Sequence, residues 1–271
     1  MKNYIEGAPY GAQFKKKEDN RMIKINFFLL SCLMLLTMIS KSQNLIPNPS
    51  FEEFYTLPSS TDEVTKCKHW YTPRGLSPDY FHSEATTPKY NYTVPIVSVP
   101  KNIFGYQNAR TGSAYVGATN YSTPLRIYTF REMIAVKLTE KLKKDSIYLL
   151  SFFVSLAESS KYYHNLFGVT FSYDSLANVK TKNGYGKVIA KNSITIKVGS
   201  IENDTADWHL VQTKYISKGG EQYLYIGITK KNLNLLSYWI TKFFHKTNLG
   251  EKPYAYYYID DVSVIKLKSN K

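Results

Sequence analysis

Apolar and polar residues alternate with a period of two along most of the chain after residue 43, which predicts β-strands rather than helices. In residues 148–156 the alternation sorts the side chains onto two faces, with Tyr148, Leu150, Phe152, Val154 and Leu156 on one face and Ser151 and Ser155 on the other. The same pattern predicts strands at residues 114–117, 133–138, 167–173, 194–198, 208–215, 223–228 and 256–265. Polar turn sequences, such as residues 143–145 and 218–220, separate them.

Each predicted strand has one apolar face, and a second sheet must cover that face. We therefore predict an all-β fold, an antiparallel β-sandwich, as a single domain over residues 44–271. Trp70 and Trp208 are assigned to its core, Trp208 because it alternates with Leu210 along a strand.

Two stretches depart from the strand pattern. Residues 54–108 are rich in proline, which opposes pairing inside a sheet, so we expect a long early loop region. In residues 232–246 apolar side chains recur at helical spacing beside Lys242, His245 and Lys246, which predicts one amphipathic helical insert (about 230–253) before the last strand. This insert either covers an open end of the sandwich or docks on a membrane surface or a protein partner through residues 233–246.

The N-terminal region is expected to lie outside the fold. Residues 27–39 contain no charge and are too few to span a bilayer, but they fit the apolar part of a signal peptide, with Lys24 before them and small residues after them. We therefore predict a signal peptide at residues 22–42 and an upstream extension or mis-assigned start at residues 1–21. A short buried helix, or a lipoprotein signal at Cys32, is the alternative.

Composition and charge narrow the class of protein. With 43% hydrophobic and 15% aromatic residues, disorder is excluded, and two cysteines exclude a disulfide scaffold. The formal net charge of +14 is spread along the chain, and no nucleic-acid-binding motif accompanies it, so we expect no nucleic-acid partner. Beyond the predicted signal peptide no segment is apolar enough to predict a transmembrane span.

Several segments are similar to known jelly-roll proteins. Residues 44–52 (NLIPNPSFE) and 256–264 (YYYIDDVSV) resemble the first and last strands of galactose-binding-like jelly rolls, the fold of many carbohydrate-binding modules. The internal segments SPDYFH (77–82), VPKNIFGYQ (99–107), AYVG (114–117), SFFVSLA (151–157) and GGEQYLYIG (219–227) resemble a narrower group. That group is the jelly-roll domain at the N-terminus of surface proteins of Gram-negative bacteria, often ahead of an OmpA-type peptidoglycan-binding domain or a sorting tail.

The resemblance implies a jelly roll and an exported protein located in the periplasm, on the outer-membrane surface or in the medium. Three departures limit it. The sequence ends seven residues after Val264, so the wall-anchoring role of longer relatives is not carried over. Relatives often have more than one cysteine in the early loop, whereas only Cys67 stands there in this sequence, and the insert has no counterpart in the group.

A metal site is predicted from the same two terminal segments. Asp260 is in phase with Tyr258, Val262 and Val264, so a core-facing strand would bury its carboxylate, which must then be compensated. In carbohydrate-binding jelly rolls the counterparts of Glu52 and Asp260 hold a structural calcium ion, and the resemblance implies Ca²⁺ here. The alternative is that Asp260 accepts backbone hydrogen bonds or pairs with a cation such as Arg131.

Catalysis finds little support in the sequence. The five histidines show no metal-binding spacing, and no GxSxG elbow, SxxK pair or phosphate-binding loop is present. A glycoside hydrolase would need two facing carboxyl groups, and the spacing of the acidic residues, Glu132 among them, does not favour such a pair. We therefore expect a protein that is not an enzyme.

Binding of a glycan fits the composition better, because sugar rings stack on aromatic side chains while polar groups hold their hydroxyls. The residues that the core would need least, with polar neighbours, are predicted to bind the ligand: Tyr121, Tyr128, Arg131, Tyr162, Tyr163, His164 and Trp239. Two hypotheses follow. One is an exported, non-catalytic binding module for surface or extracellular glycans. The other is a structural or adhesive envelope protein that binds a protein partner through the insert.

Overall fold

The structure is a computed structural model of the chain, and it describes residues 43–73, 75–85, 94–122, 131–175, 193–197, 204–227 and 246–268. Asn44–Lys271 form one compact unit. Its elements are η1 (Val64–Lys66), β1 (Trp70–Tyr71), β2 (Asp79–His82), β3 (Lys101–Asn102), β4 (Gly105–Tyr106), β5 (Ala114–Ser122), β6 (Ile134–Lys137), β7 (Ile147–Leu156), β8 (Leu166–Ser172), β9 (Ser193–Lys197), β10 (His209–Ile216), β11 (Tyr223–Ile226) and β12 (Tyr254–Lys266). No helix in these described ranges is long and apolar enough to cross a bilayer.

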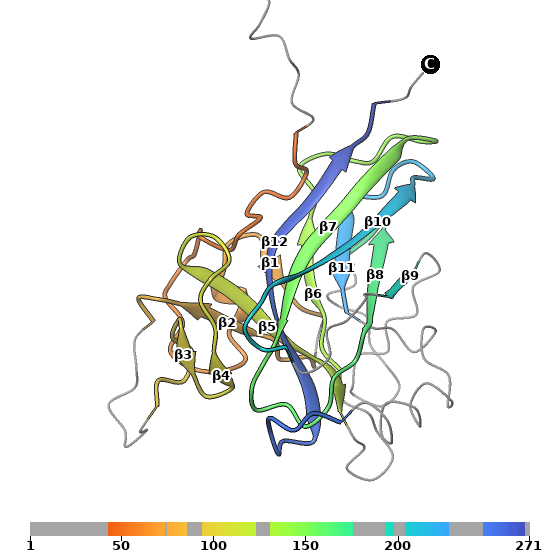
Figure 1. Ribbon diagram of the computed structural model, residues 1–271. Coiled ribbons are helices and arrows are strands. Elements are labelled where there is room, and N and C mark those ends of the chain that lie inside the picture. The colour runs from red at the N-terminus through yellow and green to blue at the C-terminus, as the bar shows by residue number, and fades with distance from the viewer. Residues whose placement is uncertain are drawn as a thin grey trace, which may run out of the picture. The chain divides into compact units, whose positions relative to one another are not determined.

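The strands form two five-stranded antiparallel sheets. Sheet I has the order β10-β7-β12-β5-β2 and sheet II the order β1-β6-β11-β8-β9, and β3 and β4 form a separate hairpin. Figure 1 shows β7, β12 and β10 in one layer and β6, β11 and β8 in the other. From β5 onward the chain changes sheet at every step except between β8 and β9. This alternation is the connectivity of a jelly roll, so the predicted antiparallel β-sandwich is confirmed.

The main core lies between the sheets and follows the predicted alternation in β7. Leu150, Phe152 and Val154 are fully buried there and belong to one cluster with Val169 and Phe171 of β8. Trp70 belongs to the same cluster, as predicted. The centroid of its ring lies 4.7 Å from that of Phe51. Residues 54–108, predicted to be a long loop region, contain four short strands, and one of them, β2, forms the edge of sheet I. The high proline content of this region hides these strands from a prediction based on sequence.

A second apolar cluster covers the other face of sheet I and explains one of two wrong predictions about which side chains face the core. This hairpin cluster consists of Phe81, Ile96, Val97, Tyr115, Ala157, Tyr256 and Tyr258, with Phe104 of the β3–β4 hairpin and Trp208 packed against it. Trp208 is therefore half-buried outside the main core. Leu210 is exposed, and Val211 and Tyr215 are the residues of β10 that face the main core.

A bulge in β12 produces the second error. Its register shifts between Asp260 and Ser263, and Asp261 has a left-handed φ of 50°. Before the bulge Tyr257 and Ile259 face the main core, and after it Val262 and Val264 do. Asp260 therefore lies on the opposite face, in phase with Tyr258. The prediction that it is also in phase with Val262 and Val264 was wrong. The helical insert predicted at about 230–253 falls mainly on residues 228–245, which lie outside the described residues.

Candidate ligand-binding site

Three tyrosines meet on the face of sheet II that points away from the main core. Tyr71 of β1 and Tyr225 of β11 both pair with Ala135 of β6, so the small Ala135 lies between them on the same face. Their rings are 6.2 Å apart at the centroids and nearly perpendicular, and their hydroxyl groups are 3.0 Å apart. Tyr223, two residues before Tyr225, shares this face.

We call this group the tyrosine platform, which consists of Tyr71, Leu76, Met133, Ala135, Tyr223 and Tyr225. Met133, Ala135 and Tyr225 form a buried base, whereas Tyr71, Leu76 and Tyr223 are half-buried and present part of their surface to solvent. The exposed Lys137 pairs with Tyr223, one row along the sheet. The site therefore combines aromatic surface with phenolic and ammonium donors.

Burial determines the protonation of the platform. It raises the pKa of Tyr71 well above its usual value of 10, and the hydrogen bond with Tyr225 raises it further. Tyr71 is therefore a neutral phenol at any physiological pH, able to donate and accept hydrogen bonds. An uncharged aromatic surface with hydroxyl groups fits a neutral, polyhydroxylated ring better than an ionic ligand.

Sequence reasoning missed the platform, although it left a signal. In β11 the residues Tyr223, Leu224, Tyr225 and Ile226 alternate, and Leu224 and Ile226 face the main core. A strand that places aliphatic residues inward places its tyrosines on the outer face. The sequence does not show, however, that Tyr71, 154 residues earlier, lies across one strand from Tyr225.

The structure brings together part of the ligand site predicted from the sequence. The ring of Tyr121 lies 5.7 Å from that of Tyr162 and is stacked 6.0 Å from that of His164, at an angle of 2°. The backbone N–H of His164 donates to the hydroxyl of Tyr257 at 3.0 Å. Tyr121, Tyr162 and Tyr163 belong to the main core, and His164 is buried. The prediction that the core does not need these residues was therefore wrong, because β12 and β5 carry the core to this end of the sandwich.

Among the predicted ligand-binding residues that the structure describes, Arg131 is the most accessible to solvent. It is half-buried, and its Nε has no hydrogen-bond partner among the described residues. Burial lowers the pKa of Arg131 to about 10, an effect that the neighbouring Tyr121 opposes. The other two predicted ligand residues, Tyr128 and Trp239, lie outside the described part of the chain. A role in ligand binding for the whole group stays a prediction.

The predicted metal ligands are held by the loop that precedes β5. The N–H groups of Ser113 and Ala114 donate to the exposed Glu52 carboxylate, at 2.9 and 3.1 Å to Oε1. Gly112, with φ of 65°, lies so close to Glu52 that a Cβ would be 2.4 Å from the carboxyl carbon, so a larger residue would be strained and would displace the Glu52 carboxylate. Glu52 thus fixes the start of β5.

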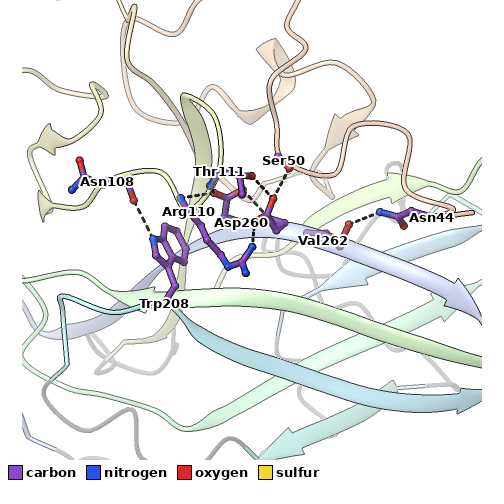
Figure 2. A network of polar contacts seen from close by, with 9 residues as sticks. Asn44, Ser50, Asn108, Arg110, Thr111, Trp208, Asp260 and Val262 are labelled. Atoms are coloured by element: carbon purple, nitrogen blue, oxygen red, sulfur yellow. Dashed lines mark hydrogen bonds and ion pairs between the residues drawn. The ribbon is translucent and has the colours of Figure 1, made fainter. Parts of the chain in front are cut away.

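The same loop closes over the buried Asp260. Its Oδ2 accepts the N–H groups of Arg110 at 2.9 Å and Thr111 at 3.4 Å, and its Oδ1 accepts the N–H of Asp261 at 2.7 Å. Figure 2 shows Arg110 and Thr111 beside Asp260, with the indole N–H of Trp208 donating to the carbonyl of Asn108 at 3.1 Å. Burial, and then the charge of Asp261, raise the pKa of Asp260 to about 8, while these hydrogen bonds oppose the rise.

Asp261 binds the loop through side chains. It accepts hydrogen bonds from the hydroxyls of Ser50 and Thr111 and pairs with the guanidinium of Arg110, which also lies 3.4 Å above the ring of Phe153. Burial would raise the pKa of Asp261, but the hydrogen bonds from Ser50, Thr111 and Arg110 lower it below its usual value. The residues before β5, the start of the fold and the bulge of β12 are joined at this point.

This arrangement does not fit the calcium site implied by the resemblance. Ca²⁺ needs six to eight oxygen ligands, whereas both carboxylates here accept N–H groups. Within the described ranges no cluster of three or more His, Cys, Asp or Glu side chains could hold a metal ion. The structure instead shows the backbone hydrogen bonds to Asp260 that the alternative to calcium predicted.

Removal of divalent cations tests the point directly. Because amide groups satisfy Glu52 and Asp260, we expect the same melting temperature in EDTA and in excess calcium chloride, measured by differential scanning calorimetry. A lower melting temperature in EDTA that calcium restores, and magnesium does not, would contradict this expectation and establish the metal site.

Two further buried carboxyl groups, those of Asp79 and Glu132, lie near Tyr256 of the hairpin cluster. Asp79 of β2 accepts the N–H of Asp62 at 2.7 Å and the hydroxyl of Tyr256. Glu132 accepts the N–H of Thr119 at 2.7 Å and the hydroxyl of Ser77 at 2.9 Å. Gly117, which pairs with Asp79, leaves room for the Tyr256 ring, because a Cβ there would lie 2.2 Å from its hydroxyl oxygen.

Burial raises the pKa of both carboxyl groups, and burial together with the charge of Glu132 raises that of Asp79 to about 8. Both groups are at most 4% exposed, so they do not face a bound substrate across an open cleft as the carboxyl pair of a glycosidase does.

The comparisons with known proteins leave the function open. No protein-family model matches the sequence, and no curated protein matches it. The chain is similar to a crystal structure of a cyclase from Fischerella sp. TAU, with 11% identity and a TM-score of 0.42 over 83% of this chain and 98% of the cyclase. It is also similar to a proposed sugar-binding protein of Bacteroides thetaiotaomicron VPI-5482 (13% identity, TM-score 0.37, 83% and 100% covered) and to a family 4 carbohydrate-binding module (13%, 0.32, 82% and 99%). Likeness at these identities and TM-scores assigns no activity, so the side chains of this chain must indicate what it binds.

Proposed function

We propose that residues 44–271 form an exported, non-catalytic binding module for surface or extracellular glycans, and that the tyrosine platform is its binding surface. The observation that carries the proposal is the convergence of Tyr71 and Tyr223, both half-buried, on the buried Tyr225. The uncharged segment at residues 27–39 supports export.

The platform has the properties that sugar binding requires. The half-buried rings of Tyr71 and Tyr223 offer apolar surface on which the C–H face of a sugar can stack, while their hydroxyl groups and the ammonium of Lys137 can bond its hydroxyls. Because Met133 and Ala135 form a packed floor, the rings are held in place before the ligand arrives. Less side-chain entropy is then lost on binding.

A glycan array followed by titration calorimetry on the best-bound glycan tests the proposal. We expect Tyr71→Ala and Tyr223→Ala each to weaken binding about tenfold, the loss that one aromatic contact of roughly 1.4 kcal/mol represents. Tyr71→Phe, which keeps the ring and loses the hydroxyl, should weaken binding less than Tyr71→Ala does.

Tyr106→Ala is the matched control. Tyr106 is 51% exposed on the β3–β4 hairpin, whose Phe104 packs against sheet I rather than sheet II. This variant should bind with unchanged affinity. Absence of binding to every glycan on the array, or equal affinities for Tyr71→Ala and Tyr106→Ala at unchanged melting temperature, would contradict the proposal.

A further inference from the structure

Strand β10 forms one edge of sheet I, and among the described residues no second strand is hydrogen-bonded to it. It pairs with β7 alone, over eight residues from His209 to Ile216. Just beyond it, the N–H of Ser217 donates to the carbonyl of Ser146 at 3.0 Å, so Ser217 turns its backbone toward β7. Backbone groups in an antiparallel strand alternate in direction, and four residues must therefore turn theirs away from β7: Leu210, Gln212, Lys214 and Ile216.

The side chains of these four residues are exposed on the outer face of the sheet. Leu210 is 43% and Ile216 65% exposed, and Ile147, which pairs with Ile216, is 41% exposed. Leu210 and Ile216 thus combine an exposed apolar side chain with backbone groups that have no strand partner among the described residues. A long edge strand of this kind is a surface to which another strand can be added.

We infer that this edge is the interface of a symmetric homodimer, in which β10 of one copy pairs antiparallel with β10 of a second copy around Thr213. In this register Leu210 lies opposite Ile216 of the second copy, and Gln212 lies opposite Lys214 of the second copy. Two-fold symmetry repeats both pairs, so the backbone groups that these four residues turn away from β7 all have partners in the second copy. Sheet I of one copy and sheet I of the other then join into one sheet of ten strands.

The order of side chains along β10 favours a second copy over an unrelated strand. The sequence Leu-Gln-Lys-Ile at the four outward positions is apolar at both ends and polar in the middle, so it complements itself when reversed. Lys214 lies opposite an amide and not opposite the other Lys214, which avoids charge repulsion. Ile216 would lie between Ile147 of its own chain and Leu210 of the second copy, so all three exposed apolar side chains become covered.

Substitution of Gln212 tests the register, because this residue lies opposite Lys214 of the second copy at two symmetric places. We expect Gln212→Glu to tighten the dimer several-fold and Gln212→Lys to weaken it several-fold, measured as the dimer dissociation constant by sedimentation equilibrium of the full protein. Thr65→Glu and Thr65→Lys make the same changes of charge at an exposed position of η1 and should leave the constant nearly unchanged.

A crosslink provides a second, independent measurement. Thr213 would face Thr213 of the second copy as a pair without backbone hydrogen bonds, where Cα atoms lie about 4.5 Å apart, a distance that a disulfide can span. Thr213→Cys should therefore yield a covalent dimer on mild oxidation, while the buried Cys67 stays reduced. The inference would be overturned if the protein stayed monomeric at every concentration. It would be overturned equally if the protein stayed monomeric and its β10 bound a strand of another protein. A dimer whose dissociation constant is the same for Gln212→Glu and Gln212→Lys would overturn it as well.

Discussion

Replacing Asp79 by Asn is expected to stabilise the protein at neutral and alkaline pH and to leave its stability near pH 4 almost unchanged. Asp79 is buried beside Glu132, and the two groups that donate to it, the N–H of Asp62 and the hydroxyl of Tyr256, are uncharged. Burial and the charge of Glu132 raise the pKa of Asp79 from 3.8 to about 8. An asparagine cannot ionise, its oxygen can accept the N–H of Asp62, and its NH₂ group can donate to Tyr256.

The direction of the effect follows from proton linkage. Between pH 4 and pH 8 the folded protein holds a proton on Asp79 that the unfolded chain releases, so the free energy of unfolding falls as the pH rises. One such group contributes a slope of up to about 1.4 kcal/mol per pH unit. The stability that protonated Asp79 contributes is complete below pH 4 and is lost as the pH approaches 8.

Urea denaturation of the wild type and the variant at intervals from pH 4 to pH 9 measures the difference. We expect the two free energies to coincide at the acidic end and to diverge steadily up to about pH 8. Glu53→Gln removes a carboxylate from the exposed surface and serves as the control, with a profile parallel to that of the wild type. Parallel profiles for Asp79→Asn and the wild type would contradict the assignment.

Replacing Asp260 by Ala is expected to cost roughly 3–5 kcal/mol of unfolding free energy. Three backbone N–H groups, those of Arg110, Thr111 and Asp261, would lose the fully buried Asp260 carboxyl group as their acceptor. A buried donor left without a partner costs about 1–3 kcal/mol, and the part-buried donors here each cost an amount near the lower end of that range. The loop before β5 would also lose its contact with β12.

The neighbouring carboxylate provides the comparison. Asp261→Asn keeps an acceptor and tolerates the left-handed backbone at this position, and Asp261 is partly accessible to water. We expect it to cost about 1 kcal/mol or less, by guanidinium denaturation at pH 7. If the two variants lost equal stability, the backbone hydrogen bonds of Asp260 would not be what holds the loop.

The sequence predicted the strands of this fold more reliably than the faces they present. Alternation located β7, β8, β10, β11 and β12 to within about two residues, because each buries one face against the main core. It failed where a strand has apolar residues on both faces. Trp208 and Leu210 share a face, as predicted, but it is the outer one, and the bulge at Asp261 reverses the phase of β12.

The sites were harder to predict because they depend on contacts between distant residues. Tyr121 and Tyr162 were expected to be spare aromatic residues, yet they fill the core where β5 ends. Tyr71 stood in a proline-rich region without a clear strand pattern, so its position beside Tyr225 could not be seen. Asp260 was predicted to be buried and compensated, which is correct, but two of the three N–H groups that compensate it belong to a loop about 150 residues earlier.

The position of β12 in sheet I determines when the sheet can form during synthesis of the chain. It is the last of the described strands along the chain, yet it lies in the middle of its sheet, between β7 and β5. During synthesis, β5 and β7 have no common neighbour until residue 266 has left the ribosome. A nascent chain that emerges N-terminus first therefore cannot complete this sheet early. The proposed export of this chain requires it to be unfolded during translocation, and the late completion of sheet I is compatible with that requirement.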